Sequence, residues 1–197
     1  TKSQRNSLDF LMGSTDRVVG IKGYAGTGKT TMLHAFTRMA EEAGYSIRGA
    51  APSAAASGVL RNEIGTETDT LAFLLMELEK EALAINAQEK PDHSEKPQEK
   101  KPEILLIDEA SMISTKQMLD LLKYADALDK RVILVGDCKQ LGAVERGNPF
   151  LLLQKSEMAC GVLTGIIRQK AADIAFAVKE TVFGNVKRGV EAIGHPS

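Results

Sequence analysis

The chain has 197 residues, 43% hydrophobic and 26% charged, so it is long enough to bury one substantial core. Its 25 basic and 26 acidic residues give a net charge of -1, which excludes a globally basic nucleic-acid binder and leaves only local binding surfaces. No apolar run reaches the roughly 18 residues of a membrane span, so we expect no membrane insertion. Two cysteines without CxxC spacing, Cys138 and Cys160, favour a reducing cytoplasm.

Apolar β-branched runs alternate with helical patterns along the chain. Strands are expected at 17–22, 46–51, 103–109, 131–137 and 161–164, and helices at 30–43, 53–62, 70–84 and 115–128. This alternation predicts an α/β fold in which a parallel central sheet carries helices on both faces. Residues 86–103 are rich in Lys, Glu and Pro, so we expect a mobile charged insertion outside the core.

The first motif, GYAGTGKT at residues 23–30, follows a predicted strand and precedes a predicted helix. It fits G-x-x-x-x-G-K-[ST], in which backbone N–H groups surround phosphate oxygens. Lys29 would reach the β- and γ-phosphates, and the Thr30 hydroxyl would bind Mg²⁺. A purely structural turn is the alternative. The predicted nucleotide-binding residues of this loop are Gly23, Gly26, Gly28, Lys29, Thr30 and Thr31.

The second motif is ILLIDEAS, residues 104–111, in which two carboxylates follow a buried strand. Open α/β sheets bind ligands at the carboxyl ends of their strands. Asp108 is suited to hold Mg²⁺, and Glu109 to orient and deprotonate an attacking water. A pair that caps the next helix is the alternative. The carboxylates favour a hydrolase over a small-molecule kinase.

A third element, VILVGDCKQLGAV at residues 132–144, is a predicted strand followed by a polar loop. The neutral amide of Gln140 could hydrogen-bond a γ-phosphate and respond to its loss. An ordinary exit from a strand is the alternative.

Six motifs in this order resemble those of RecD-like superfamily 1 helicases, most closely the helicase portion of conjugative relaxase-helicases of the TraI and TrwC type. They are GYAGTGKTT, APSAAASGVL, DTLAFLL, IDEASM, VGDCKQLGAVERG and LTGIIRQK. The resemblance implies a RecA-like P-loop NTPase that uses ATP and Mg²⁺ to move 5′ to 3′ along single-stranded DNA in conjugative transfer. In that family ATP lies between two RecA-like domains.

Further roles follow from the resemblance alone. Gln4 corresponds to a glutamine that recognises adenine, with a simple exposed residue as the alternative. Pro52, Ser53 and Thr70 would contact the DNA backbone, although both hydroxyls could instead cap helices. Arg168 would reach the γ-phosphate from the second motor domain and act in catalysis. Read without the resemblance, Arg168 is a surface charge that follows an apolar run.

The resemblance also suggests a domain division. Residues 1–163 would form the ATP-binding motor domain, and 164–197 the beginning of a truncated second RecA-like domain. Motifs V and VI are absent, so this chain alone should not unwind DNA. Its expected partners are single-stranded DNA, the second motor domain and a relaxase domain of the same chain. A non-hydrolytic RecA-like module that binds DNA, or another P-loop ATPase or kinase, remains as an alternative.

Overall fold

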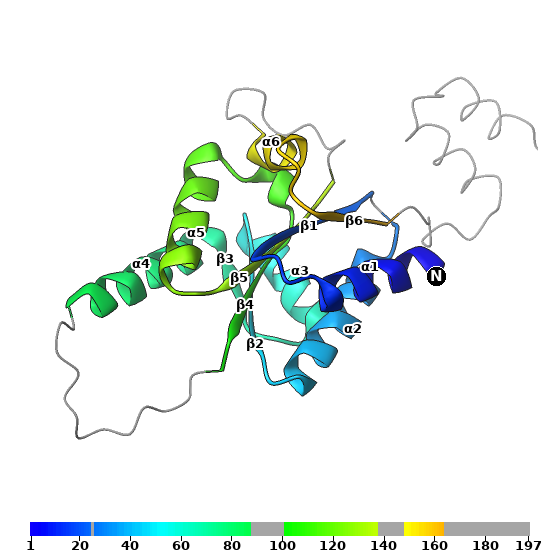
Figure 1. Ribbon diagram of the computed structural model, residues 1–197, viewed down its shortest axis with the longest axis horizontal. Helices are drawn as coiled ribbons and strands as arrows, with labels where there is room; N and C mark the ends of the chain where they lie inside the picture. The colour runs from blue at the N-terminus through cyan, green and yellow to red at the C-terminus, as the bar shows by residue number, and fades with distance from the viewer. Residues whose placement is uncertain (25, 88–100, 138–147, 164–197) are drawn as a thin grey trace, which may run out of the picture.

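A computed structural model describes residues 1–24, 26–87, 101–137 and 148–163 (Figure 1). Within them lies a six-stranded sheet of order β3-β2-β4-β5-β1-β6, in which all neighbouring strands run parallel. Its strands are β1 (Val18–Gly23), β2 (Ser46–Ala51), β3 (Thr68–Thr70), β4 (Glu103–Ile107), β5 (Arg131–Gly136) and β6 (Cys160–Leu163). The predicted parallel α/β architecture is confirmed.

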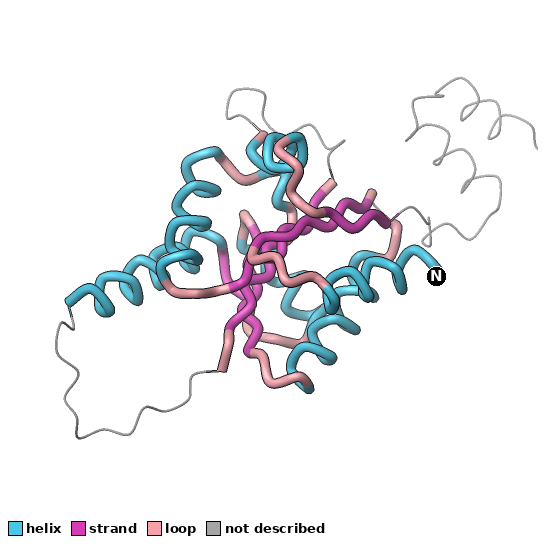
Figure 2. The backbone as a smooth tube through the Cα atoms, in the orientation of Figure 1, coloured by secondary structure: helices cyan, strands magenta, loops and turns pink. Residues whose placement is uncertain are grey.

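Helices cover both faces of this sheet, as predicted (Figure 2). One face carries α1 (Lys2–Gly13), α2 (Lys29–Glu42) and α3 (Ala54–Ile64). The other carries α4 (Leu71–Ala87), α5 (Thr115–Ala127), α6 (Pro149–Lys155) and the 3-10 turn η1 (Ala110–Met112). No helix among the described residues is long and apolar enough to cross a bilayer.

The strands read as continuous apolar runs because they supply two cores at once. In β4, Ile104 and Leu106 pack with α1, α2 and α3, whereas Leu105 and Ile107 pack with α4 and α5. Successive side chains of a strand point to opposite faces of the sheet, so both sets must be apolar when both faces are covered. The two cores hold the carboxyl ends of the strands in fixed relative positions.

Four elements were not predicted from the sequence, of which the turn η1 is one and α1, β3 and α6 are the others. The polar start of the chain forms α1, whose first turn carries a capping box between Thr1 and Gln4. The three-residue strand β3 lies at the sheet edge, where pairing with β2 defines it. A third element, α6, has Asn148 as its N-cap and Pro149 in its first turn, a combination that marks a helix start.

The predicted insertion 86–103 is too long at both ends. Helix α4 continues to Ala87, and Glu103 already belongs to β4, so these positions are part of the regular structure. Residues 88–100 lie outside the described residues.

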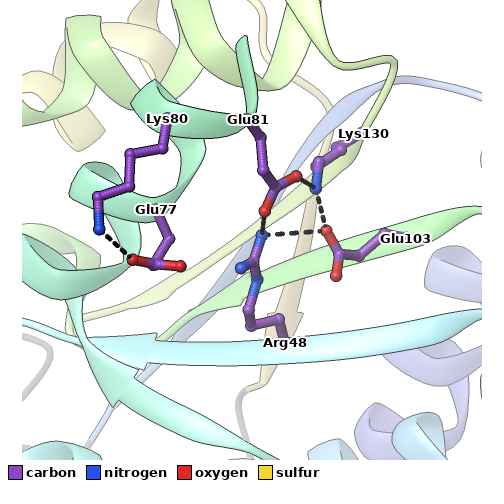
Figure 3. A network of polar contacts seen from close by, with 6 residues as sticks. All are labelled: Arg48, Glu77, Lys80, Glu81, Glu103 and Lys130. Atoms are coloured by element: carbon purple, nitrogen blue, oxygen red, sulfur yellow. Dashed lines mark hydrogen bonds and ion pairs between the residues drawn. The ribbon is translucent and has the colours of Figure 1, made fainter. Parts of the chain in front are cut away.

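A network of four charged side chains lies where strands β2, β4 and β5 begin (Figure 3). Lys130 Nζ donates to Glu81 Oε2 at 2.5 Å and also to Glu103. Arg48 Nη2 donates to Glu81 Oε1 at 2.9 Å and to Glu103 Oε2 at 3.3 Å. The Lys130 side chain is only 10% exposed, so solvent screens these contacts weakly. The network fastens α4 to the sheet.

The network also lowers the pKa of Glu81. Partial burial would raise the pKa of Glu81, but the hydrogen bonds and charges of Lys130 and Arg48 bring it below the ordinary value of 4.5. A carboxyl whose pKa is lowered by folding adds stability above its unfolded pKa. This contribution disappears as the pH falls through the folded pKa.

We expect Glu81→Gln to lower the free energy of unfolding by about 1 kcal/mol at pH 7, because Glu81 keeps 34% of its side chain exposed. The loss should shrink at pH 4, below the ordinary value of 4.5, because the unfolded chain then takes up a proton that the folded network opposes. Urea denaturation at both pH values measures it. Glu77→Gln is the control, since Glu77 pairs only with the 64% exposed Lys80 among the interactions drawn in Figure 3. An equal loss at both pH values would contradict this electrostatic account.

Candidate functional site

The predicted phosphate loop and carboxylates meet at the carboxyl edge of the sheet. The loop follows β1, and Asp108 and Glu109 follow β4. Strand β5 lies between β1 and β4 and ends at Gly136. The chain leaves β1 for β2, on the far side of β4 and β5, and later returns to β6 on the other flank of β1. This reversal creates the crevice in which open α/β sheets bind ligands.

Glycines give the phosphate loop its shape. Gly26 and Gly28 have φ angles of 78° and 81°, in the left-handed region that suits glycine. A Cβ atom at Gly23 would lie 2.9 Å from Cγ of Lys29, so only glycine leaves room for that stem. Lys29 Nζ donates to the Gly23 carbonyl at 2.9 Å, and its ammonium is therefore held across the loop.

Helix α2 begins directly after the loop and points its amino end at the same place. Its N-cap is Gly28, which provides no side-chain cap. The N–H groups of Lys29, Thr30 and Thr31 in the first turn therefore have no intrahelical acceptors, and the helix dipole adds partial positive charge. This arrangement suits an anion such as a phosphate group.

The backbone holds the carboxylate of Asp108 in place. Asp108 Oδ1 accepts from the Glu109 N–H at 2.8 Å. Burial raises the pKa of Asp108 to about 6. The Glu109 N–H opposes the rise, the Glu109 charge adds to it, and the Lys29 charge lowers it. Because the charge of Lys29 acts on Asp108, the loop and the carboxylates share one electrostatic environment.

Glu109 occupies an unusual backbone conformation. Its φ of 51° and ψ of 38° lie in the left-handed region, which costs energy for a residue with a side chain. Its buried Oε2 has no hydrogen-bond partner among the described residues. An unpaired buried carboxylate oxygen beside a second carboxylate fits a site for a divalent cation and a bound water. Asp108 and Thr30 would supply the cation's ligands.

Close packing places the end of β5 against this motif. A Cβ atom at Gly136 would lie 2.9 Å from Cε1 of Phe150 and 3.1 Å from the backbone nitrogen of Ser111. Glycine is therefore needed where β5 passes η1. Residue Gln140, a few positions further on, lies outside the described residues, as do Arg168 and the expected second domain at 164–197. Their predicted roles stay predictions.

Gln4 lies beside the phosphate loop, although 24 residues separate it from Gly28 in sequence. Its Nε2 donates to the Gly28 carbonyl at 3.0 Å, and its Oε1 accepts within the capping box of α1. An open pocket of about 560 Å³ lies here between α1 and α2. Its lining residues are Thr1, Lys2, Gln4, Arg5, Leu8, Thr31, Met32 and Ala35. Adenine recognition by Gln4 stays a prediction, with this pocket as a place for the base.

The predicted DNA contacts come together at the other end of the same edge. Strand β2 pairs with β3 so that Ala51 lies opposite Thr70, which brings Pro52 and Ser53 close to Thr70. Ser53 Oγ accepts from the Ala56 N–H at 3.2 Å, and Thr70 Oγ1 accepts from the Phe73 N–H at 3.3 Å. Both hydroxyls therefore cap helices, as the alternative interpretation held. Each keeps an O–H that can donate to a phosphate.

The predicted nucleotide-binding and DNA-binding residues follow neighbouring strands of the sheet. The backbone N–H of Asp108 donates to the Ala50 carbonyl at 2.9 Å, two residues before Pro52. One strand spacing, about 4.8 Å, therefore separates the end of β4, which carries the carboxylates, from the end of β2, which leads to Pro52 and Ser53. Thr70 ends β3, one strand further from β4.

Together the parallel sheet, the phosphate loop and the paired carboxylates define a RecA-like P-loop NTPase domain. A family model described as "AAA domain" matches residues 1–195, and the chain belongs to that family.

Curated relatives match almost the whole chain. Multifunctional conjugation protein TraI of Escherichia coli (strain K12) is 29% identical, over 97% of this chain and 10% of the relative. Conjugal transfer protein TraA of Rhizobium radiobacter is 28% identical, over 96% and 16% respectively. ATP-dependent RecD2 DNA helicase of Deinococcus radiodurans is 32% identical, over 87% of this chain and 22% of the relative. The resemblance to RecD-like and conjugative helicases is thus confirmed, and the chain spans about a tenth to a fifth of these relatives' lengths.

Among solved structures, AMPPCP-bound DnaA from Aquifex aeolicus aligns with a TM-score of 0.44 and 17% identity, over 98% of this chain and 58% of that one. Likeness at this level does not bear on function.

Because burial raises the pKa of Asp108, we expect that removing its charge stabilises the fold. Asp108→Asn should raise the free energy of unfolding at pH 7.5 by roughly 1–3 kcal/mol in buffer without nucleotide or Mg²⁺. The substitution removes a desolvated charge and keeps an acceptor for the Glu109 N–H. Guanidinium denaturation measures the change. Asp9→Asn, at an exposed position of α1, is the matched control and should change stability by less than about 0.5 kcal/mol. A destabilised Asp108→Asn protein would contradict the electrostatic account.

Proposed function

We propose that this chain is the ATP-binding motor domain of a DNA helicase that translocates 5′ to 3′ along single-stranded DNA during conjugative transfer. One observation carries the proposal. The strand that holds the two carboxylates is hydrogen-bonded, through Asp108 and Ala50, to the strand that leads to the predicted DNA contacts. A motor needs such proximity, because hydrolysis at one site must alter binding at the other. The conjugative and RecD2 relatives support the substrate.

In this proposal the loop residues bind the triphosphate. Lys29, now hydrogen-bonded to the Gly23 carbonyl, exchanges that acceptor for oxygens of the β- and γ-phosphates. Free N–H groups of the first turn of α2 bind the remaining oxygens. Thr30 and Asp108 would hold Mg²⁺, which would neutralise phosphate charge when bound. Base recognition falls to Gln4 and the pocket between α1 and α2.

Hydrolysis then depends on Glu109. Its buried Oε2, unpaired among the described residues, accepts a proton from the attacking water and orients that water toward the γ-phosphate. Gln140 would respond to the γ-phosphate, and Arg168 would stabilise the transition-state charge across the domain interface. The strained backbone of Glu109 keeps the carboxylate in place before the substrate arrives.

Single-stranded DNA would bind along Pro52, Ser53 and Thr70. Both hydroxyls lie at the amino ends of helices, where partial positive charge compensates for the absence of a basic surface. This explains how a chain of net charge -1 could bind a polyanion.

Full activity would require more than residues 1–163. We propose that a second motor domain begins at residue 164 and completes the ATP site, and that a relaxase domain accompanies it in the whole protein. We also propose the cytoplasm as its location, because both cysteines lack the spacing of a disulfide framework. The low coverage of the relatives is in keeping with additional domains.

Steady-state MgATP hydrolysis by the natural chain that contains these residues, with and without single-stranded DNA, tests the proposal. We expect DNA to stimulate turnover strongly. Glu109→Gln should lower kcat by about 100-fold or more while nucleotide binding persists, whereas Lys29→Ala should weaken nucleotide binding itself. Fluorescent ATP-analogue titrations separate these effects.

Each result that contradicts the proposal would indicate a different assignment. Turnover that ignores DNA would indicate another P-loop ATPase or a kinase. DNA binding without turnover would indicate an idle RecA-like binding module. Normal hydrolysis by the Glu109→Gln variant would remove Glu109 from the role of base.

A further inference from the structure

Helix α4 carries two large apolar side chains exposed near its amino end. Phe73 is 47% exposed and Met76 is 42% exposed, one turn further along the same side of the helix. Leu71, Leu74 and Leu78 form the opposite side, which is buried against the sheet and α5. Phe73 and Met76 therefore lie on the side of α4 that faces away from this core.

Phe73 is tied to one of the predicted DNA contacts. Its backbone N–H donates to Thr70 Oγ1 at 3.3 Å, so the position of Phe73 is set by the residue that caps α4. Helical side chains lean toward the amino end of their helix, so the Phe73 ring covers the surface beside this cap. The pairing of Ala51 with Thr70 brings the Ser53 cap to the neighbouring strand end.

Donors for phosphate and an exposed aromatic ring thus lie side by side on one edge. Single-stranded nucleic acid presents the complementary pair in each unit: an anionic phosphate and an unpaired base with a flat π-face. A folded protein partner would not need the two hydroxyl donors, and a paired duplex would not offer base faces to a ring. The hydrogen-bond donors and the flat apolar ring together favour a single strand.

We propose that Phe73 is a base-stacking residue for single-stranded DNA, with Met76 extending the apolar surface under the same or the next base. The inference rests on the proposed function, and it adds a base contact to the backbone contacts at Ser53 and Thr70. A stacking contact tolerates every base, which suits a protein that moves along DNA of any sequence.

The sequence offers a direct probe, because the chain contains no tryptophan. In a Phe73→Trp variant the indole is a single reporter, and stacking on a base should quench its emission. We expect quenching by a thymidine oligomer and none by an abasic oligomer of equal length. A Leu83→Trp variant is the control, since Leu83 is 62% exposed further along α4 and should not respond to either oligomer.

Affinity provides an independent measurement on the natural chain that contains these residues. Phe73→Leu keeps an apolar side chain but removes the π-face, so it should weaken binding of the thymidine oligomer about tenfold, as measured by fluorescence anisotropy. Binding of the abasic oligomer should not change. Ser53→Ala should instead weaken the binding of both oligomers equally, because it removes a hydroxyl that donates a hydrogen bond to phosphate.

These results separate the two proposals. If the unaltered chain binds the thymidine oligomer but the Phe73→Trp emission stays constant at saturation, Phe73 does not stack and only this inference fails. Equal affinities of Phe73→Leu and the unaltered chain would have the same meaning. If the unaltered chain binds neither oligomer, the proposed DNA function fails and the stacking role fails with it.

Discussion

Parallel pairing of all the strands in the sheet imposes one constraint on everything else in the molecule. Strands that run in the same direction must end at the same edge, so whatever follows each strand is brought to a common line. Along that line lie the phosphate loop after β1, Asp137 after β5, the carboxylates after β4, and the two helix caps at β2 and β3. The opposite edge carries the starts of the strands and the charged network.

The order of the strands then sorts these features into two regions. The predicted nucleotide-binding residues follow β1 and β4, and the predicted DNA contacts follow β2 and β3. The hydrogen bond between Asp108 and Ala50 crosses the boundary between the regions. Movement at the end of β4 would therefore be transmitted to the neighbouring strand through a backbone contact, without a long chain of intervening side chains.

The carboxylates at the two edges of the sheet have different surroundings. Around Lys130 and Arg48, each carboxylate has cationic partners, and the network adds stability. At the carboxyl edge, Asp108 is desolvated and Glu109 is both strained and unpaired among the described residues. Local instability of this kind is common where a protein must bind a ligand that supplies the missing charge. The paired edge compensates for it and fixes the direction of α4, whose amino end reaches the predicted DNA region.

Patterns in the sequence were sufficient to predict the fold class, the order of the main strands and helices, the phosphate loop and the carboxylate pair. These depend on local patterns: apolar strands buried on both faces, and residues at fixed spacing such as Gly28, Lys29 and Thr30. Short elements such as β3 and α6 were not predicted, because so few residues show little hydrophobic periodicity. Three features became visible in the folded chain alone: Gln4 contacts the loop, Glu109 has a left-handed backbone, and Phe73 is exposed beside Thr70. Each of these depends on segments distant in sequence or on which face of an element is covered, and local pattern does not encode either.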